Sequence, residues 1–498
     1  MAGQVNHVVV VGDDVDAMLA ALILRIRIPY WNVTLVLSES SRVANIDEST
    51  TPLVPNFLHN VLGFGGQAFM DEVRPVWKLG IRFDWGSEDA QPFNYPYDHH
   101  LDHQLGWMEK VNAYCCMDDL SATSHFSLMM DKDLSPFIRL PNGSVMMDNE
   151  YGYHLEHGAF KRFLTDMLRV EQVAVLSGYV SKVSQGESGN VDSLQLDDGR
   201  VVSGDMFVDG TGEQSLLLHQ TMGEQFVAYD KSLLCDSVLM FSRPRTTEAV
   251  RPYTTVQTMD NGWSWQVDHD GRISYGYVYS SRFTDESAAI SEMQLRYGVG
   301  QPVARRSMKQ GRYQNFWSGN VFAVGDASGV IEPLQSTKLH TVVEQSRYVG
   351  QCLFDARGHI HSRMVALENH RYRRQWDAIR DFLAMHYRFN YKRDTPFWNA
   401  CREQTDLGEA ARIVEYFQQA GPSTMVSALT NRNDIGRYTD YMTMLIGQGV
   451  PTNCPAKAGE QDRRIWDEQR NRFRENVSTA MSVPQARSLL LQPQLMAS

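Results

Sequence analysis

The first forty residues alternate between short apolar runs and one helical segment. The run from His7 to Val11 predicts a strand, Gly12 interrupts it, and residues 16–28 are rich in Ala, Leu and Ile, as is typical of a helix. A second apolar run follows at residues 33–37. Two continuous apolar strands joined by a helix are typical of a parallel βαβ unit that is buried on both faces. The pattern therefore predicts an α/β nucleotide-binding domain that begins here.

Later apolar runs indicate that this domain is discontinuous in sequence. Further strands are predicted within residues 173–183, 205–212 and 320–326, the last of which contains the sequence NVFAVGD. Each run is short, apolar and followed by a glycine-containing turn or a polar segment. We therefore expect these segments to return to the sheet that the first strands begin.

The segments between these returns have a different pattern. Residues 85–155 and 225–300 are rich in aromatic side chains, and residues 274–280 read SYGYVYS. Alternation with a period of two, with Tyr and Val, predicts an antiparallel sheet, which we interpret as a substrate layer. After Ser336 the chain becomes helical, with apolar residues at steps of three and four around residues 376–386. We therefore predict an α/β fold with a discontinuous Rossmann-like domain, an antiparallel β substrate layer and a helical C-terminal subdomain.

Length and composition limit the classes of partner. The chain of 498 residues exceeds the roughly 250–300 residues at which single cores stop growing, so we expect two domains. No segment approaches the ~20 apolar residues of a membrane span, and a net charge of -12 argues against a surface for nucleic acid phosphates. The six cysteines have no metal-like spacing, and the N-terminus has no secretory signal. We expect a cytoplasmic protein with reduced thiols and a small-molecule substrate, and with no nucleic acid or membrane partner.

The turn after the first strand keeps only one glycine of the dinucleotide pattern G-x-G-x-x-G. Asp14 and Ala17 stand at the second and third glycine positions, and Leu37 stands where an acid usually binds the ribose. Glycine lets the backbone approach a pyrophosphate at a helix N-terminus, whereas Asp14 brings a side chain and a negative charge. An ordinary strand-to-helix turn is therefore an equal alternative, and we expect any dinucleotide to be held weakly. The residues predicted to contact it here are Gly12, Asp14, Val15, Ala17 and Ser38.

Two later turns strengthen the case for a flavin. Asp209 begins the sequence DGTG after one apolar strand, and Gly325 with Asp326 follows another. Flavoproteins use an aspartate at such a strand end to bind the ribityl chain, with the next helix N-terminus facing the flavin. Either turn alone occurs in many proteins without a cofactor, but the two in this order point to FAD. We assign residues 1–84, 156–224 and 301–350 to the FAD-binding domain, and 85–155, 225–300 and 351–498 to the substrate-binding region.

Several spaced motifs then identify a family. The motifs are DESTTP at 47–52, WKLGIRF at 77–83, VDGTGEQSLL at 208–217, WSWQV at 263–267, EPLQST at 332–337, and WDAIRDFLAMHY from Trp376. Together and in this order they resemble the flavin-dependent tryptophan halogenase family over nearly the whole chain. The resemblance implies an enzyme in which reduced FAD and oxygen convert a halide ion into a hypohalous oxidant, which then halogenates an electron-rich aromatic substrate.

The resemblance also implies residue roles. Lys78 matches the family's lysine, which holds the oxidant beside the substrate, although an unplaced lysine is most often a solvated residue on a strand edge. Trp263 and Trp265 alternate along a strand and so point to one face. They match the wall between flavin and substrate, and two buried indoles are otherwise most often plain core.

The motif at 332–337 departs from the family. Leu334 is implied as a flavin contact, and Ser336, Thr337 and Lys338 as the halide site, where the family has glycine in place of Lys338. Lys338 would therefore change the shape of that site, and its charge if the ammonium faces the halide. Gln335 stands where the family has glutamate, and glutamine can form hydrogen bonds but cannot act as a general base near neutral pH.

The sequence contains no reductase module, so we expect a separate flavin reductase to supply reduced FAD. Two other functions stay open. One is a flavin-dependent aromatic monooxygenase, which would oxidise NADH without a partner, and the other is a non-catalytic descendant of the halogenase fold, suggested by Asp14, Leu37, Gln335 and Lys338. The polar run DHHLDH at 98–103 suggests a metal, but its spacing favours a loop, and we expect no metal site.

Overall fold

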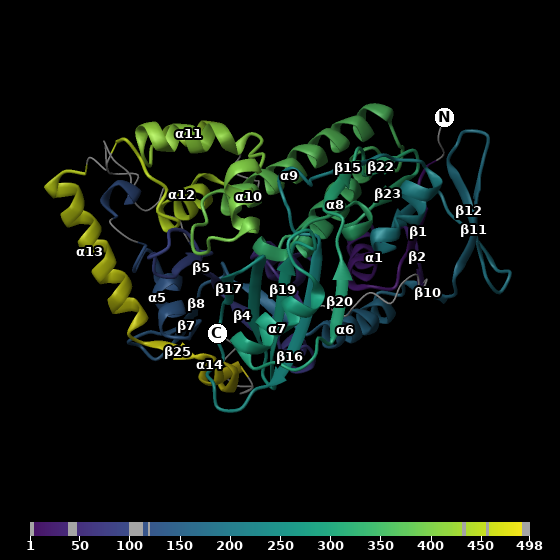
Figure 1. The fold of residues 1–498 in the computed structure, drawn as a ribbon. Helices are drawn as coiled ribbons and strands as arrows, with labels where there is room; N and C mark the ends of the chain where they lie inside the picture. The colour runs from purple at the N-terminus through teal and green to yellow at the C-terminus, as the bar shows by residue number, and fades with distance from the viewer. Residues whose placement is uncertain are drawn as a thin grey trace. The chain divides into compact units, whose positions relative to one another are not determined.

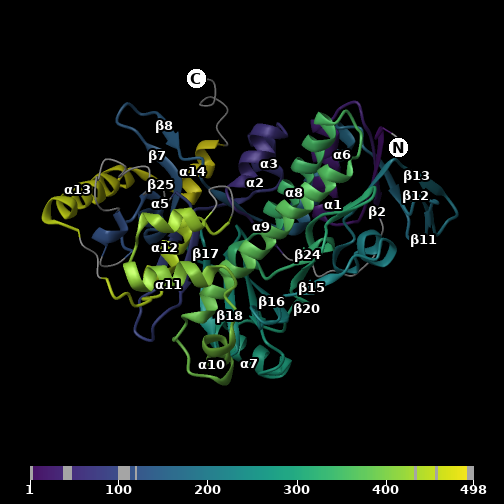
Figure 2. The same ribbon diagram turned by 90° about the horizontal axis from the view of Figure 1, so that it is seen from above.

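The computed structural model describes residues 4–37, 47–98, 113–117, 120–430, 435–454 and 458–490 (Figures 1 and 2). The chain divides into two compact units, each built from three segments. The first unit comprises Met1–Arg74, Leu155–Asp230 and Met308–Trp376, and the second comprises Pro75–His154, Lys231–Ser307 and Asp377–Ser498.

The first unit contains a parallel sheet, two smaller sheets and covering helices. Its strands are β1 (His7–Val11), β2 (Asn32–Leu37), β3 (Glu48–Ser49), β10 (Ala174–Ser177), β11 (Val180–Gln185), β12 (Val191–Leu196), β13 (Val201–Ser203), β14 (Met206–Asp209), β15 (Phe226–Ala228), β21 (Gly311–Tyr313), β22 (Trp317–Ser318), β23 (Val321–Ala323) and β24 (Gly329–Val330). Its helices are α1 (Val15–Arg27), α2 (Leu53–Asn56), α3 (Gly66–Glu72), α6 (His157–Val170) and α8 (Lys338–Asp355), with helical turns η1 (Phe57–Val61), η3 (Gly212–Gln214), η4 (Leu216–Thr221), η5 (Gly325–Ala327) and η6 (Pro333–Gln335).

The main sheet of the first unit has the strand order β10-β2-β1-β14-β23-β22. All pairs from β10 to β23 are parallel, and only β22 pairs antiparallel, at the edge. Four consecutive valines of β1 are fully buried, as both faces of the strand are covered. The βαβ unit predicted at the N-terminus and its later strands are confirmed, with the first helix at Val15–Arg27.

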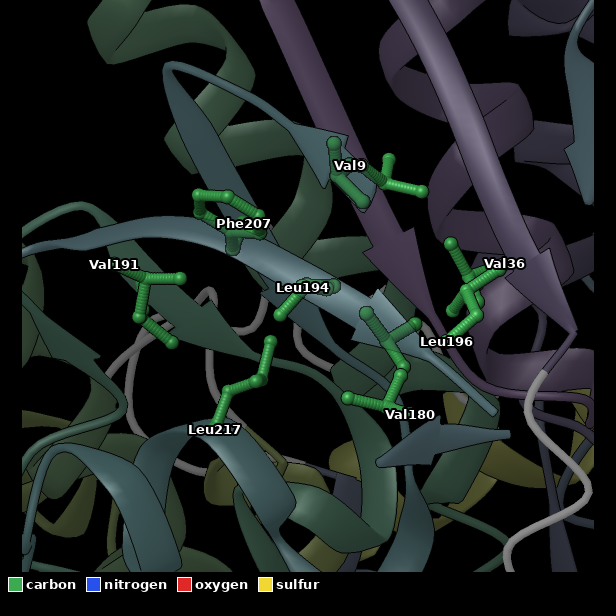
Figure 3. Close-up of a cluster of buried hydrophobic side chains, with 11 residues drawn as sticks. Val9, Val36, Val180, Val191, Leu194, Leu196, Phe207 and Leu217 are labelled. Carbon is green, nitrogen blue, oxygen red and sulfur yellow. The ribbon is translucent and has the colours of Figure 1, made fainter. Parts of the chain in front are cut away.

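The hairpin sheet β11-β12-β13 covers one face of this main sheet. Val9 and Val36 of the main sheet pack in one buried cluster with Leu194 and Leu196 of the hairpin sheet (Figure 3). Leu217, from the turn after β14, closes the same cluster. Helix α1 packs against β2, α6 and α8. The arrangement keeps the carboxyl ends of β1 and β14 next to the N-terminus of α1.

The second unit is built on a larger sheet. Its strands are β4 (Val76–Lys78), β5 (Gly80–Asp84), β6 (Phe93–Pro96), β7 (Leu134–Arg139), β8 (Val145–Met147), β9 (Gly152–Leu155), β16 (Ser237–Pro244), β17 (Thr254–Met259), β18 (Gly262–Asp268), β19 (Arg272–Tyr279), β20 (Ala304–Ser307) and β25 (Ala480–Ser482). Its helices are α5 (His125–Asp131), α7 (Glu286–Tyr297), α10 (Pro396–Gln404), α11 (Ala410–Ala420), α12 (Tyr438–Gly447), α13 (Glu460–Val477) and α14 (Val483–Leu490), with turns η2 (Ala113–Cys116) and η7 (Thr424–Leu429), and α9 (Ser362–Arg388) contributes to both units.

The large sheet has the order β20-β16-β19-β18-β17-β5-β6 and is antiparallel except between β17 and β5. The alternating segment at 274–280 lies mostly in β19, and α7 packs on its aromatic side chains. The predicted antiparallel layer and the C-terminal helices are confirmed, and the fold class with them. The identity of either unit as the FAD-binding or the substrate-binding part stays a prediction.

The unit boundaries differ from the sequence-based ones by six or seven residues near 230 and 307, and by more at two places. Residues 75–84 lie in the second unit, because β5 pairs with β17 and β6 of the large sheet. Residues 351–376 lie in the first unit, because the end of α8 and the first half of α9 pack there. All six cysteines are free thiols. Within the described part of the chain, no helix has the length and apolar character needed to cross a membrane.

The cluster between main sheet and hairpin sheet gives a stability prediction. Leu194 is fully buried in it, whereas Val201 of the same hairpin sheet is 62% exposed. Leu194→Ala is expected to lower the free energy of unfolding by about 2–5 kcal/mol, because truncation loses apolar contact and leaves a cavity. Val201→Ala is expected to change it by less than about 0.5 kcal/mol. Urea unfolding followed by tryptophan fluorescence measures both, and equal effects of the two variants would contradict the packing described here.

Candidate functional site: a strand-turn-helix cradle and a buried lysine

The turn between β1 and α1 has no room for side chains. Gly12 has φ +148°, and a Cβ there would lie 2.2 Å from the carbonyl oxygen of Gly210, in the turn after β14. A Cβ on Gly210 would lie 2.7 Å from Cβ of Ala17 in α1. The two turns therefore meet backbone to backbone at the start of α1, which is the geometry that lets a phosphate approach helix N–H groups. The backbone at this place therefore fits the diphosphate of a dinucleotide, whereas Asp14 and Asp16 bring acidic side chains to it.

Asp14 caps α1, and its carboxylate has partners in the folded chain. Its carboxylate accepts a hydrogen bond from the Val15 N–H at 2.8 Å and lies 3.2 Å from Nε2 of His157. Burial acts to raise the pKa of Asp14, but Lys338, His157 and the Val15 N–H together hold it below its usual value. The aspartate at the second glycine position thus replaces a phosphate-binding element with a helix cap.

Lys338 lies among three carboxylates. Its Nζ is 2.9 Å from Glu48 Oε1, 3.3 Å from Asp16 Oδ1 and 3.8 Å from Asp14 Oδ2. Burial acts to lower the pKa of Lys338, but Asp16 and the other acids raise it well above its usual value, so the side chain stays a cation. The side chain adds bulk beside the predicted halide site. Because these acids surround the ammonium, its charge is paired with Glu48 and Asp16.

Asp16 is the most constrained of these acids. It is 5% exposed, and its Oδ1 forms an ion pair with Lys338 but no hydrogen bond. Burial raises the pKa of Asp16 to about 8, against the opposing effect of Lys338, and Asp326 adds to the rise. Gly325 has φ +57°, and a Cβ there would lie 2.1 Å from Asp16 Oδ2. Gly325 is therefore needed to make room for this carboxylate, and Gly325 and Asp326 lie beside the acids of α1.

The segment that contains the predicted halide site is tied to residues 48–51. Ser336 has φ +57°, and its Oγ donates to Oγ of Ser49 at 3.1 Å. Thr51 Oγ1 lies 2.9 Å from Nδ1 of His340. Thr337 is the N-cap residue of α8, is 1% exposed, and its Oγ1 has no hydrogen-bond partner. A buried, unpartnered hydroxyl beside helix N–H groups suits a small anion.

Leu334 and Gln335 precede this segment in the short turn η6. Both are buried, with exposures of 1% and 4%. The residues predicted for the flavin and halide thus come from β1–α1, η5, η6 and the start of α8, all in the first unit. Ser38 lies outside the described residues.

Asp209 forms hydrogen bonds within the turn that follows β14. Its carboxylate accepts hydrogen bonds from the N–H groups of Leu217 and Leu218 at 2.7 and 2.8 Å, and from the N–H and hydroxyl of Thr211. The side chain is fully buried, and burial raises its pKa against the effect of these donors. Both oxygens are therefore occupied by the chain, and any effect of Asp209 on a flavin passes through the shape of this turn.

Lys78 is fully buried in the second unit. It ends β4, opposite Gly152 of β9, and its Nζ lies 5.2 Å from the ring centre of Tyr97. The neighbouring Trp77 packs edge-on against Phe137, with ring centres 5.1 Å apart. Burial lowers the pKa of Lys78 well below its usual value, because this apolar environment disfavours the ammonium. The solvated-lysine alternative is wrong.

Trp263 and Trp265 lie on β18 with ring centres 5.7 Å apart. Both are buried, and Nε1 of Trp263 has no hydrogen-bond partner. Trp265 stands opposite Gly276 of β19, where a Cβ would lie 1.9 Å from its indole ring. Gly276 therefore makes the space that holds this indole across the strand. The role of the pair as a wall stays a prediction.

Several residues of these two places were missed by sequence reasoning. Asp16, His157 and His340 were not singled out, and Glu48 was read only as part of the motif at 47–52. The signal for Asp16 was present, since an acid on the first turn of α1 in a phosphate-binding pattern needs a compensating cation. Tyr97 carried no such signal, because only the fold brings it to Lys78.

No metal site is found in the part of the chain that the structure describes. Of the polar run at 98–103, only Asp98 is described, and it is buried and accepts a hydrogen bond from the Phe126 N–H. Burial raises the pKa of Asp98 to about 7. The rest of that run lies outside the described residues.

Comparison with known proteins assigns the chain to a family. A model of the tryptophan halogenase family matches residues 7–462. The chain belongs to the tryptophan halogenase family. It is therefore a flavin-dependent halogenase, as the motifs indicated.

The family contains similar enzymes and structures. The chain is 27% identical to tryptophan 7-halogenase RebH of Lentzea aerocolonigenes, over 81% of this chain and 80% of that protein. It is 27% identical to tryptophan 6-halogenase SttH of Streptomyces toxytricini, over 86% of each. The crystal structure of MibH, a lathipeptide tryptophan 5-halogenase, is 28% identical, has a TM-score of 0.89, and aligns with 99% of this chain and 95% of its own.

The burial of Lys78 gives a prediction for stability and pH. Lys78→Met keeps the length of the side chain and removes the amine, and is expected to raise the free energy of unfolding at pH 7 by about 1–3 kcal/mol. The unfolded lysine binds its proton up to about pH 10.5, whereas the folded one releases it at lower pH, so wild-type stability rises with pH across that interval. The advantage of the variant therefore shrinks as pH approaches 10.5.

Urea unfolding at pH 7 and pH 10 measures this difference. Lys182→Met, which changes an exposed lysine of β11, is the matched control and is expected to show no such pH-dependent difference. A Lys78→Met protein that is less stable than wild type at pH 7 would show that the ammonium has favourable contacts in the folded state.

Proposed function

We propose that this protein uses reduced FAD, oxygen and a halide ion to make a hypohalous oxidant, and that Lys78 directs that oxidant to an electron-rich aromatic substrate. The proposal rests on one observation above others, the fully buried lysine with a lowered pKa at the position where the family has its lysine. A neutral amine has a lone pair that binds an electrophilic halogen, whereas an ammonium only donates hydrogen bonds.

The cradle of Gly12, Gly210 and Ala17 would hold the diphosphate of FAD, with Gly325, Asp326 and Leu334 at its other contacts. Reduced FAD, when bound, would supply two of the four electrons that reduce oxygen, and the halide would supply the other two as it is oxidised to hypohalous acid. Thr337, at the start of α8, would hold the halide with its buried hydroxyl and the adjacent N–H groups. Because the oxidant is small and diffusible, Lys78 can act on it after it forms.

The substrate is proposed to be tryptophan or a related indole. RebH and SttH are tryptophan halogenases, and MibH is a halogenase of tryptophan in a lathipeptide, so both the free amino acid and a tryptophan-containing peptide are candidates. Trp263 and Trp265 offer flat apolar surfaces that suit exclusion of water next to an aromatic ring. A separate flavin reductase is the proposed source of reduced FAD, and the six free thiols support a reducing, cytoplasmic environment.

Product analysis tests this function directly. The protein is incubated with FAD, NADH, a flavin reductase, oxygen and chloride or bromide, with tryptophan or a tryptophan-containing peptide, and products are analysed by mass spectrometry. One halogen in place of one hydrogen is expected. A hydroxylated product, with NADH oxidised when the reductase is omitted, would assign the protein to the aromatic monooxygenases. Failure to bind reduced FAD at any concentration would identify a non-catalytic descendant.

The role of Lys78 predicts that the two half-reactions separate. Lys78→Met is expected to reduce product at least about 100-fold, as loss of a positioned reactive group does, while oxidation of reduced FAD by oxygen continues at the wild-type rate. Stopped-flow absorbance follows the flavin, and mass spectrometry follows the product. The Lys182→Met protein serves as control and is expected to keep both. Product formation near the wild-type level in Lys78→Met would remove Lys78 from the mechanism.

Gln335 predicts a dependence on substrate and halide. Halogen attack forms a cationic ring intermediate that must lose a proton, and a carboxamide cannot take it. Water can still accept that proton, so the main deficit is expected in attack by a weakly polarised oxidant. Activated rings should be favoured over poor ones, and bromide over chloride, and Gln335→Glu should narrow the halide preference roughly tenfold. Competition assays with paired halides measure this, and wild-type protein that uses both halides equally would show that Gln335 imposes no limit.

A further inference from the structure

The contacts of Lys338 allow an inference that rests on the proposed FAD binding and adds to it. Lys338 stands in α8, more than three hundred residues along the chain from α1, yet its Nζ contacts Asp16 of α1 and Glu48 of β3. The family has glycine at this position, so the side chain is a departure with a structural consequence. The question is what this cation does beside the N-terminus of α1.

The local charge is strongly negative without Lys338. Asp14, Asp16 and Glu48 all lie within 3.8 Å of its Nζ, and Asp326 adds to the field that they create. His157 faces Asp14 at 3.2 Å, and Lys161 acts on Asp14 more weakly. Asp16 and Glu48 are each 5% exposed, so water screens them little. An anionic ligand at the start of α1 would therefore meet repulsion from several buried carboxylates.

Two further features indicate that an anion is nevertheless received here. Gly12 has the positive φ and the absence of room for a Cβ that a close phosphate requires. Thr337 Oγ1 is buried and has no hydrogen-bond partner, one residue before Lys338. These features lie at the starts of α1 and α8. The backbone there is typical of a phosphate site, whereas the acidic side chains are typical of a cation site.

We propose that Lys338 is the positioning residue that makes this cradle acceptable to a diphosphate, by neutralising the carboxylate of Glu48 beside Asp16. Its ammonium compensates the local negative charge, so that the positive end of the α1 dipole can attract the phosphate. The same contact fastens Glu48, and with it the segment tied to α8 through Ser49 and Thr51. Charge compensation by a distant lysine thus takes the place of the missing second glycine.

Four proteins test the proposal through oxidised FAD binding, measured by quenching of flavin fluorescence. They are wild type, Lys338→Met, Glu48→Gln and the double variant. Lys338→Met is expected to weaken FAD binding roughly tenfold or more, because uncompensated acids then face the diphosphate. Glu48→Gln is expected to bind FAD severalfold more tightly than wild type, and the double variant is expected to recover most of the affinity lost in Lys338→Met.

The double variant separates charge from packing. If Lys338 only fills space, removing the Glu48 charge cannot restore binding, and that result would overturn the proposal, as would a Lys338→Met protein that binds FAD like wild type. Thermal unfolding of all four proteins is measured in parallel. Lys182→Met is the matched loss of a lysine and is expected to leave FAD affinity unchanged.

Two further results keep the test decisive. If Lys338→Met does not fold, Glu48→Gln in the wild-type background removes one acid while the lysine stays, and FAD binding severalfold tighter than wild type is expected; weaker binding contradicts the proposal. A wild-type protein that does not bind FAD at all contradicts the proposed function itself. A wild type that binds FAD while Lys338→Met binds it equally well contradicts only the role of Lys338.

Discussion

The close approach of two backbones at Gly12 and Gly210 constrains the position of α1 in the first unit. Any side chain at either position would overlap the facing turn or Ala17, so α1 can begin only where it does. That placement points the start of α1 toward η5 and the start of α8, which bring Asp326 and Lys338 to it. A single steric limit thereby collects residues from three separate stretches of sequence at one helix end.

Electrostatic interactions determine which side chains can lie at the start of α1. The familiar way to receive phosphates at such a turn is to omit side chains, and this chain omits them only at Gly12 and Gly210. At the second glycine position it has Asp14, which is used as a helix cap, and Asp16, two residues further, is buried beside Gly325. A buried carboxylate is tolerated only with a partner, and the partner comes from α8. The second unit buries a lysine in place of acids. Lys78 lies near the ring of Tyr97, and its burial favours the neutral form of the amine.

Much of the fold could be predicted from the sequence, because period and burial follow from local pattern. The valines of β1 and the alternation at 274–280 fixed strand type correctly, and the motif order identified the family. The boundary near residue 75 could not be predicted, since β5 and β6 join the large sheet through the pairing of β5 with β17, far along the chain. For the same reason the sequence could show that Asp14 and Lys338 depart from the family pattern, but not that one lies near the other.

The strand order of the first unit also bears on how the protein is synthesised. Strand β14 pairs on one side with β1 and on the other with β23, whose residues end at Ala323 in a chain of 498. Until that segment leaves the ribosome, the outer edge of β14 exposes unpaired backbone groups beside buried apolar residues, a condition that promotes aggregation. The main sheet of the first unit therefore cannot be completed until β23, in the third segment of that unit, has been synthesised. Protection of the β14 edge by chaperones is expected to matter until then.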